Sequence, residues 1–335
     1  MKETPDSTEL ASVYMPAALE GLAHFPVDAG EIKLVTQSEN VTFRVTDDDN
    51  RYVFRLHRPG YNSLDELNSE RAWTAALNEA GIPAPDSILA RDGNHFVQVT
   101  IPATGEQCYA GMTRWLDGIP LGEHLDTPSG SSQRTRLFGR LGELAAAMHN
   151  QAANWPLPPG FTRPRLDAEG LLGEMPRWGR FWEHAALSAA EQKLLGKSRN
   201  ELCDVLADYG ETPDRFSLIH ADMNADNTIY NDGRLAIIDF DDSAFGWHLY
   251  DLAAILIDET QAPDFQAIRS ALISGYRSCR PIADADVEWL DRFLLIRGLV
   301  TIGWFHQRPE HSDSELFHRL KHWVLETCDA GSESR

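Results

Sequence analysis

Residues 218–243 read LIHADMNADNTIYNDGRLAIIDFDDS, and this stretch decides the fold. It contains two short apolar runs, at 228–230 and 235–238, separated by Asn-Asp-Gly at 231–233. Because Asp-Gly is a strong signal for a tight turn between antiparallel strands, the pattern predicts a β-hairpin. A hairpin returns the chain to its starting point, so the residues that flank it are expected to lie close together.

Three polar residues lie around this hairpin. Asn227 precedes the first strand, Asp239 follows the second, and Asp222 lies on the loop that enters it. An amide oxygen beside a carboxylate suits Mg²⁺, a hard cation that takes oxygen ligands and keeps several waters. The sequence therefore predicts a Mg²⁺ site at Asn227 and Asp239. Asp222 can face the same space, where it would accept a proton from a substrate hydroxyl.

The order His-x-Asp-x-x-x-x-Asn, hairpin, Asp-Phe resembles the catalytic half of the protein-kinase-like phosphotransferases. The chain resembles in particular the aminoglycoside phosphotransferase and choline kinase family, and its Asp-Phe-Asp-Asp run resembles the homoserine-kinase-like and bacterial stress-kinase subgroup. Ala221 replaces the arginine of protein kinases and Asp241 their glycine, which points to the small-molecule branch. The resemblance implies an α+β, bilobal fold. Residues 1–116 would form a nucleotide-binding lobe with a small antiparallel sheet and a helix, and residues 117–335 a larger, mainly helical lobe that carries the catalytic residues and binds the substrate.

The remaining polar residues of the stretch are expected to be mostly structural. His220 is predicted to pack beneath the loop, and Asp251 to hold that loop through backbone N–H groups. Asp251 lies in Tyr-Asp-Leu-Ala at 250–253, a further match to the family. Solvated loop carboxylates are expected at Asp226, Asp232 and Asp242. Asp241 is left open between contact with metal, with substrate or with water.

The composition bounds the possible partners. The chain has 335 residues, of which 42% are hydrophobic, so a substantial core can form. Asp and Glu number 51 against 30 Lys and Arg, a formal net charge of −21, which argues against nucleic acid and anionic membranes as partners. This charge is compatible with a cationic substrate, although solubility alone is the simpler explanation of the acidity.

The cysteines and the apolar runs indicate the compartment. Cys108, Cys203, Cys279 and Cys328 are scattered without metal or redox spacing, as expected of reduced thiols. No apolar run follows the N-terminus, and none approaches the ~18 residues that a transmembrane helix needs. A cytoplasmic protein is therefore expected.

The N-terminal third is expected to form an antiparallel sheet. A lead-in helix is predicted at 17–22, followed by strands at 31–36, 41–46 and 51–57. In the family that the chain resembles, the turn after the first strand covers the nucleotide phosphates. Here that turn carries Ser38 and Asn40 in place of a glycine-rich loop. Ser38 is thus a candidate nucleotide contact, and both residues have an equally good interpretation as plain turn residues.

Arg55 occupies the position of the phosphate-binding lysine of kinases. Alternation along its strand places it on the face opposite Phe54 and Leu56, where an arginine needs an anionic partner. Nucleotide phosphate is one such partner. Glu70, inside a helix predicted from Ser63 to residue 80, is the expected protein partner. A surface role for Arg55, with Arg58 as the competing candidate, stays open.

Strands are further predicted at 87–91, 96–102 and 108–115. The last of them ends where the family has its hinge between lobes. Backbone recognition of adenine is expected there, at Thr113, Arg114, Trp115 and Leu116.

The rest of the chain is predicted to be helical, at 134–151, 189–209, 252–258, 264–277, 284–307 and 314–327. The aromatic cluster at 178–184 is expected in the core, with a substrate-pocket wall as the alternative. His149 is expected to be structural. Candidates for acceptor contacts, without a choice among them, are Asp258, Glu259, Trp304 and His306.

Together these features predict an ATP- and Mg²⁺-dependent kinase that phosphorylates a hydroxyl of a small molecule. An amino alcohol, an amino acid, a sugar and an aminoglycoside all remain open as acceptors. One rival is a bacterial Ser/Thr protein kinase of the stress-response type. The other rival is a nucleotide-binding pseudokinase. The presence of all three predicted catalytic and metal-binding residues argues against it: Asp222, Asn227 and Asp239.

Overall fold

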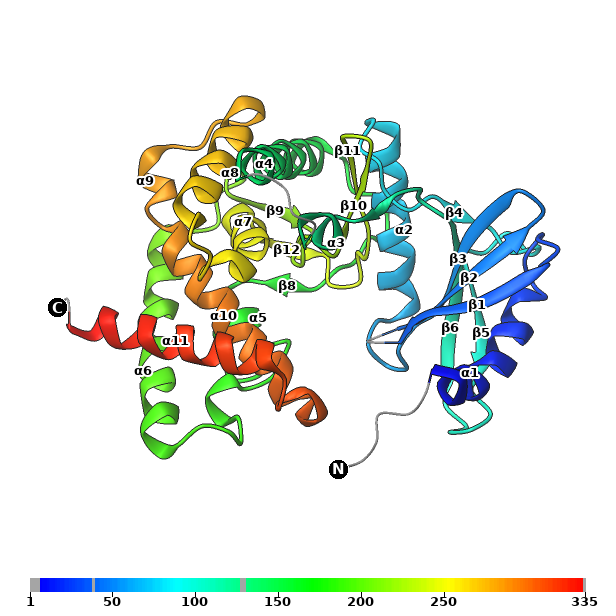
Figure 1. Cartoon of the computed structure of the whole chain (residues 1–335), viewed down its shortest axis with the longest axis horizontal. Helices are drawn as coiled ribbons and strands as arrows, with labels where there is room; N and C mark the ends of the chain where they lie inside the picture. Colours follow the sequence, from blue (N-terminus) through cyan, green and yellow to red (C-terminus); the bar gives the residue numbers. More distant parts are fainter. Residues whose placement is uncertain (1–6, 38–39, 127–130, 334–335) are drawn as a thin grey trace. The chain divides into compact units, whose positions relative to one another are not determined.

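The computed structural model describes residues 7–37, 40–126 and 131–333, and it has the predicted α+β composition (Figure 1). The chain forms two compact units. The N-terminal unit contains residues 1–119, 156–163 and 229–241, and the C-terminal unit contains 120–155, 164–228 and 242–335. Two segments that follow residue 116 in the sequence, 156–163 and 229–241, thus belong with the N-terminal unit. A single division of the chain after residue 116 places both of them in the other unit.

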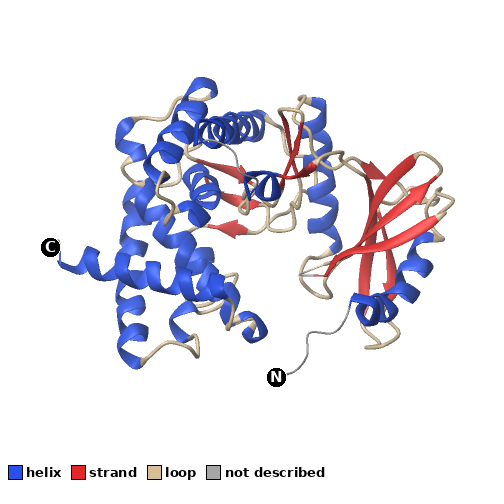
Figure 2. Ribbon diagram, in the orientation of Figure 1, coloured by secondary structure: helices blue, strands red, loops and turns tan. Residues whose placement is uncertain are grey.

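The N-terminal unit is built on an antiparallel sheet with strand order β1-β2-β3-β6-β4, in which β5 also pairs with β6. Figure 2 shows the strands of this sheet in red. Its strands are β1 Glu31–Gln37, β2 Val41–Asp47, β3 Asn50–Leu56, β4 Ser87–Ile88, β5 Phe96–Thr100 and β6 Gln107–Arg114. Helix α1, Ser7–Leu22, covers one face, where Ala18 and Leu22 share a buried core with Phe54 and Val99. The predicted sheet is therefore present, with strand ends shifted by one or a few residues.

Strand β3 shows the predicted alternation. Tyr52, Phe54 and Leu56 are buried in the core under α1, whereas Val53 and Arg55 lie on the other face. Helix α2, Leu64–Glu79, begins with a capping box in which the Ser63 hydroxyl accepts from the Glu66 N–H and the Glu66 carboxylate accepts from the Ser63 N–H. The N-terminal boundary of this helix was predictable because the cap is encoded locally.

The predicted hairpin is present as β10 Thr228–Asn231 and β11 Arg234–Ile237, in a small sheet with β7 Ile119–Pro120. Asp232 and Gly233 both have left-handed backbone, with φ of 45° and 82°. Two consecutive positive φ values are the geometry of a type I′ turn, whose twist matches that of the strands it joins. Asp-Gly therefore predicts this turn because both residues tolerate a positive φ.

The C-terminal unit is mainly helical, with a small sheet of order β8-β12-β9. Its longer helices are α4 Ser131–Asn154, α6 Ala189–Tyr209, α7 His248–Leu256, α8 Phe265–Cys279, α10 Leu290–His306 and α11 Glu315–Glu333. Its strands are β8 Arg165–Leu166, β9 Phe216–Ile219 and β12 Ala244–Trp247, and its short helices are α3 Leu121–Asp126, α5 Ala168–Leu172 and α9 Asp284–Val287. Helices α4 and α8 approach closely at Gly139 and Gly275, where a Cβ on Gly275 would overlap the Gly139 carbonyl. Trp178, Phe181 and His184 are buried, which supports the core interpretation of the aromatic cluster.

Several predicted elements differ from the structure. The lead-in helix begins at Ser7, ten residues before the predicted start. The strand predicted at 87–91 ends at Ile88, because the Ala90 N–H bonds to the Asn94 carbonyl and the Arg91 N–H to that of His24. The helix predicted at 284–307 is broken into α9 and α10, since the Trp289 N–H bonds to the Asp286 carbonyl three residues back.

In the part of the chain that the structure describes, no helix combines the length and the apolar character that crossing a bilayer requires.

Candidate active site

In the N-terminal unit, Arg55 lies between two carboxylates that follow the hairpin. Its Nη1 donates to Asp239 Oδ1 at 3.0 Å and to Asp241 Oδ1 at 3.2 Å. The Arg55 and Asp241 side chains are 16% and 9% exposed, whereas that of Asp239 is 37% exposed. Strand β3 and the segment after β11 thus meet in a charge cluster, of which only Asp239 presents a substantial surface to solvent.

Burial and charge act in opposite directions on this cluster. Burial alone would lower the pKa of Arg55, but Asp239 and Asp241 raise it above its usual value. Burial would raise the pKa of Asp241, but Arg55, His57 and the hydrogen bond from Asn40 lower it to about 2. The arginine and Asp241 are therefore both charged around neutral pH, which their mutual burial requires.

His57 lies at the edge of the same cluster. Its Nδ1 is 3.8 Å from Asp241 Oδ1, and neither buried ring nitrogen has a hydrogen-bond partner among the described residues. Burial lowers its pKa to about 3, with Arg55, Arg71 and Arg163 acting in the same direction and Asp241 against it. His57 is therefore neutral around pH 7 and adds no charge to the site.

The predicted ion pair between Arg55 and Glu70 is wrong. Glu70 does lie inside α2 and is buried, but its Oε1 pairs with Nη1 of the adjacent Arg71, at 3.3 Å. Arg55 instead bonds to the two aspartates after β11, which the sequence did not identify as its partners. Burial raises the pKa of Glu70, and Arg71 opposes this. Two arginines compete for the buried anions here, and the pairing depends on which side chains reach them.

Four of the predicted site residues nevertheless line one small pocket, from three strands or loops and one helix. Its walls are formed by Val53, Arg55, Glu70, Arg71, Pro85, Gly111, Thr113 and Asp239. Its lining thus combines two arginines with the partly exposed carboxylate of Asp239. Arg58, the competing candidate, is exposed and lies over the Tyr61 ring, so it is not part of this wall.

The predicted hinge residues lie at the end of β6. The Arg114 N–H donates to the Asp86 carbonyl at 2.8 Å, and the Trp115 N–H to that of Arg51 at 3.0 Å. Within the described ranges, no backbone hydrogen bond uses the N–H of Leu116. Of the four predicted positions, Leu116 therefore offers the donor that a ligand could use.

The turn after β1 is described only in part. Ser38 lies outside the described residues. Asn40 is buried: its Nδ2 donates to Asp241 Oδ2, and its Oδ1 accepts from the Arg58 N–H at 3.1 Å. Asn40 thus has a structural role in joining the start of β2 to the segment after the hairpin, as the plain turn interpretation allowed.

In the C-terminal unit, Asp222 is held from two sides within its own loop. Asn227 Nδ2 donates to Asp222 Oδ2 at 2.7 Å and to the Asp222 carbonyl at 2.9 Å. Asn224 Nδ2 donates to Asp222 Oδ1 at 3.3 Å, and Asn224 Oδ1 accepts from the Asn227 N–H at 2.9 Å. The two residues predicted to act on acceptor and metal are therefore in direct contact, and the side chain of Asp222 is 25% exposed.

Arg297, from α10, is the residue of this site that the sequence analysis missed. Its Nη2 donates to Asp222 Oδ1, and its Nη1 to the Ala221 carbonyl at 3.2 Å and the Tyr250 hydroxyl at 3.4 Å. Burial would lower its pKa, but Tyr250 and Asp222 raise it above its usual value. The available signal was an arginine inside the apolar run Phe-Leu-Leu-Ile-Arg-Gly-Leu-Val, because a buried cation needs an anion.

A second network of buried hydrogen bonds holds the loop at His220 and Ala221, and Asp251 lies at its centre, as predicted. Its two oxygens accept from the N–H groups of His220 at 3.0 Å and Ala221 at 2.6 Å. His149 Nε2 lies 3.0 Å from Asp251 Oδ2, and His149 Nδ1 lies 2.9 Å from the Tyr276 hydroxyl. His220 is fully buried, with its Nδ1 accepting from the Asp222 N–H at 3.3 Å. The structural roles expected for these histidines and for Asp251 are confirmed.

Two non-glycine residues in these loops have left-handed backbone. Ala221 has a φ of 68° and Asp239 a φ of 62°. Such backbone costs free energy for an L-residue and persists only where surrounding contacts hold it. The contacts include Asp251 and Arg297 at Ala221 and Arg55 at Asp239. Both strained residues flank predicted functional side chains or carry them, which is where stored strain is commonly found.

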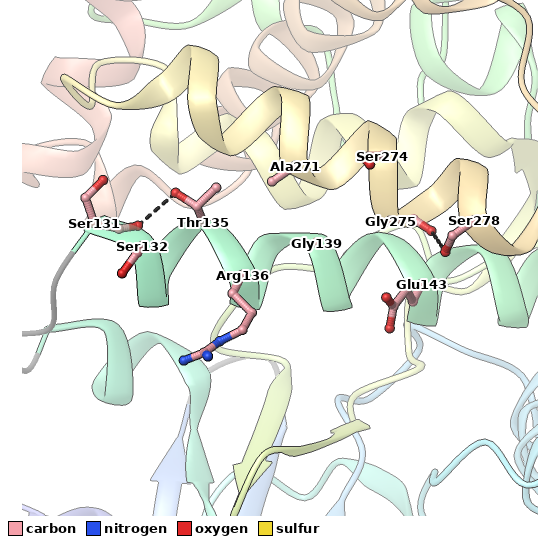
Figure 3. Close-up of a pocket in the computed structure, with 10 residues that line it drawn as sticks. All are labelled: Ser131, Ser132, Thr135, Arg136, Gly139, Glu143, Ala271, Ser274, Gly275 and Ser278. Atoms are coloured by element: carbon pink, nitrogen blue, oxygen red, sulfur yellow. Dashed lines mark hydrogen bonds between the residues drawn. The ribbon is translucent and has the colours of Figure 1, made fainter.

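Two of the candidate acceptor-binding residues, Glu259 and Trp304, already contact arginine side chains, and the second hollow of the structure lies elsewhere. Glu259 is paired with Arg134, and Trp304 lies 4.4 Å beneath the Arg308 guanidinium. The second hollow is an open groove lined by residues of α4 and α8, and in Figure 3 the Arg136 side chain points away from α8.

Each of the two predicted metal ligands, one in each unit, has an oxygen atom that can bind a hard cation. Asn227 uses its Nδ2 on Asp222, so its oxygen is the atom left for a ligand, and Asp239 has a partly exposed carboxylate. Both supply the oxygen donors that Mg²⁺ prefers. Among the described residues, no cluster of three or more His, Cys, Asp or Glu forms a protein-only metal site.

Comparison with known proteins agrees with this architecture. A sequence profile of the phosphotransferase enzyme family matches residues 31–285. The homoserine kinase of Pseudomonas aeruginosa is 26% identical over 287 residues, covering 83% of this chain and 82% of the relative. The solved structure of a microcompartment-associated aminopropanol kinase has a TM-score of 0.80 and 29% identity, covering 94% of this chain and 95% of that one. An amicoumacin kinase solved with AMP-PNP and Ca²⁺ has a TM-score of 0.77 and 18% identity, covering 95% of this chain and 96% of that one.

The sheet with its helix, the helical second half and the His-x-Asp loop before a hairpin define a kinase-like phosphotransferase. The chain belongs to the phosphotransferase enzyme family that also contains the aminoglycoside phosphotransferases and choline kinases.

Proposed function

We propose that this protein transfers the γ-phosphate of ATP, with Mg²⁺, to a hydroxyl of a small molecule that also carries an amine. The observation that carries the proposal is the arrangement around Asp222, a partly exposed carboxylate fixed by Asn227, Asn224 and Arg297. Such a group can orient a hydroxyl and accept its proton. Phosphoryl transfer asks little more of a protein than alignment and neutralisation of charge.

Each unit supplies one part of this chemistry. In the C-terminal unit, Asp222 aligns the acceptor hydroxyl and takes its proton as the bond to phosphorus forms. In the N-terminal unit, Arg55 grips the nucleotide phosphates, and the N–H of Leu116 recognises adenine. Asn227 and Asp239, which flank the same end of the hairpin, would hold the Mg²⁺ that neutralises the phosphate charge.

The acceptor class is inferred from the relatives. Aminopropanol and homoserine each combine an amine with a hydroxyl, and the kinases named for them match this chain along most of its length. A net charge of −21 favours approach of a cationic molecule over an anionic one. A hydroxylated amine of low mass is therefore the acceptor that we propose.

The proposal is tested by following ADP release with ATP and Mg²⁺ against a panel of acceptors. The panel holds amino alcohols, hydroxylated amino acids, choline, neutral sugars and aminoglycosides. We expect turnover to be confined to amine-bearing alcohols. Turnover on neutral sugars alone would contradict the acceptor class, and labelling of protein but of no small molecule would favour the protein-kinase alternative.

The role of Arg55 gives a specific prediction. Arg55→Ala should raise the Michaelis constant for ATP and lower kcat, because both the charge and the fork that positions it are lost. Arg55→Lys should recover only part of the activity, since a point charge replaces a planar fork. Steady-state ATP kinetics of these variants, beside Arg58→Ala as the matched control, check this. An Arg55→Ala enzyme with unchanged ATP kinetics would mean that another residue binds the phosphates.

The contact between Arg297 and Asp222 gives another. Arg297→Gln should lower kcat by roughly tenfold or more, the scale of losing a hydrogen bond between charged groups, with little change in the Michaelis constant for ATP. Arg292→Gln, at an exposed arginine of the same helix, is the control. If Arg297 acts through Asp222, the Arg297→Gln change should cost little further activity in an Asp222→Asn background. Fully additive losses would contradict this role.

A further inference from the structure

We propose that Asp241 is the positioning residue for Arg55, in the place that the sequence assigned to Glu70. The inference rests on the proposed function, because it concerns how the nucleotide phosphates are gripped. It also answers the question that the sequence left open, whether Asp241 contacts metal, substrate or water.

The contacts of Asp241 identify it as the buried anchor of the cluster. Its carboxylate accepts from Arg55 Nη1 at 3.2 Å and from Asn40 Nδ2. Its backbone carbonyl accepts from Arg163 Nη2 at 2.6 Å and Asn62 Nδ2 at 3.2 Å. A carboxylate fixed through its main chain and both oxygens is a rigid reference point, and Arg55 is one of the groups that it orients.

The two other carboxylates near Arg55 are less suited to this task. Glu70 pairs with Arg71, and its Oε2 has no hydrogen-bond partner within the described part of the chain. Asp239 contacts Arg55, but its side chain is 37% exposed against 9% for Asp241. Asp239 is therefore the carboxylate that can turn to another ligand, and Asp241 is the one that keeps the guanidinium in place when it does.

The consequence is an exchange of partners relative to the kinase pattern. The acid from helix α2 is neutralised by its neighbour Arg71, and the acid two residues after Asp239 takes over Arg55. Because Asn40 also bonds to Asp241, the start of β2 and the middle of β3 are tied to one carboxylate. Loss of Asp241 should thus loosen the phosphate grip more than loss of Glu70.

The test compares Asp241→Asn with Glu70→Gln, two changes that remove charge and keep shape. Nucleotide affinity is measured by calorimetric titration with ADP in the absence of Mg²⁺, and the ATP kinetics are measured with Mg²⁺. We expect Asp241→Asn to weaken ADP binding roughly tenfold or more, as for loss of a charged hydrogen bond, and Glu70→Gln to have a clearly smaller effect. Asp232→Asn, at an exposed turn carboxylate whose left-handed backbone asparagine tolerates, is the control.

A double-mutant cycle separates positioning from a general loss of structure. If Asp241 acts through Arg55, Asp241→Asn should have little further effect on ADP affinity in an Arg55→Met background. Should Asp241→Asn fail to fold, Asp241→Glu replaces it, because it keeps the charge but displaces it, and a weaker loss of the same kind is expected.

Unchanged ADP affinity in the folded Asp241 variant would overturn the inference, and so would fully additive losses in the double-mutant cycle. A defect confined to the Mg²⁺ requirement would also overturn it, because it would make Asp241 a metal ligand. Failure of the proposed function gives a different result: the unaltered protein would phosphorylate no amine-bearing alcohol, whereas the ADP titrations of the variants would still report on Asp241.

Discussion

Asp222→Asn should leave nucleotide binding nearly intact and reduce kcat by a factor on the order of 10²–10⁴, the usual contribution of a positioned proton acceptor. The amide keeps the shape of the side chain and a hydrogen-bonding oxygen, so the acceptor hydroxyl can still bind. What is lost is the capacity to take the proton as the phosphoryl group arrives. Single-turnover kinetics with saturating ATP, together with ADP titration, separate these two effects.

The ion pair between Asp222 and Arg297 means that the Asp222→Asn change also affects stability. Replacing the carboxylate leaves Arg297 buried without its anion, which is destabilising by itself. Thermal unfolding of the variant therefore accompanies the kinetics, and Asp226→Asn, at an exposed carboxylate of the same loop, is the control. A collapse of ATP affinity with kcat preserved would make Asp222 a binding residue.

The second large effect is expected at Asp239. Asp239→Ala should abolish Mg²⁺-dependent turnover, because it removes the one charged oxygen donor that we assign to the cation. Since Asp239 has left-handed backbone, alanine also adds strain, whereas asparagine tolerates this conformation. Asp239→Asn therefore separates loss of the charge from loss of the fold.

For Asp239→Asn we expect a folded protein with severely reduced turnover and a raised requirement for Mg²⁺. The measurement is a Mg²⁺ titration of ADP release, with circular dichroism to verify folding. Full activity of folded Asp239→Ala or Asp239→Asn protein at ordinary Mg²⁺ would contradict the assignment.

Local signals made much of the fold predictable. The hairpin follows from Asp232-Gly233, two residues that tolerate the left-handed backbone of the turn. Helix α2 begins directly after Ser63 because its capping box is encoded within four residues. Asp251 could be assigned a structural role from its place in the family pattern, and its bonds to two backbone N–H groups bear this out. In each case the deciding interaction spans few residues or follows a shared motif.

The errors concern side chains that choose partners across long sequence separations. Nothing near Arg55 in the sequence indicates whether Glu70, Asp239 or Asp241 will reach it, and the presence of Arg71 beside Glu70 decided the outcome. Arg297 lies 75 residues after Asp222, so only its position inside an apolar run could have indicated a buried ion pair. Which buried charges pair depends on how the side chains pack, and a sequence motif does not specify this packing.

The central claim is that Asp222 serves phosphoryl transfer from ATP to a hydroxyl of a small amine-bearing molecule. Phosphorus NMR of the products, with the protein, ATP, Mg²⁺ and an amino alcohol or hydroxylated amino acid, tests it most directly. We predict a phosphomonoester on the acceptor hydroxyl that appears together with ADP and is nearly absent with Asp222→Asn. Formation of inorganic phosphate alone, or an equal rate of ester formation with Asp222→Asn, would contradict the account.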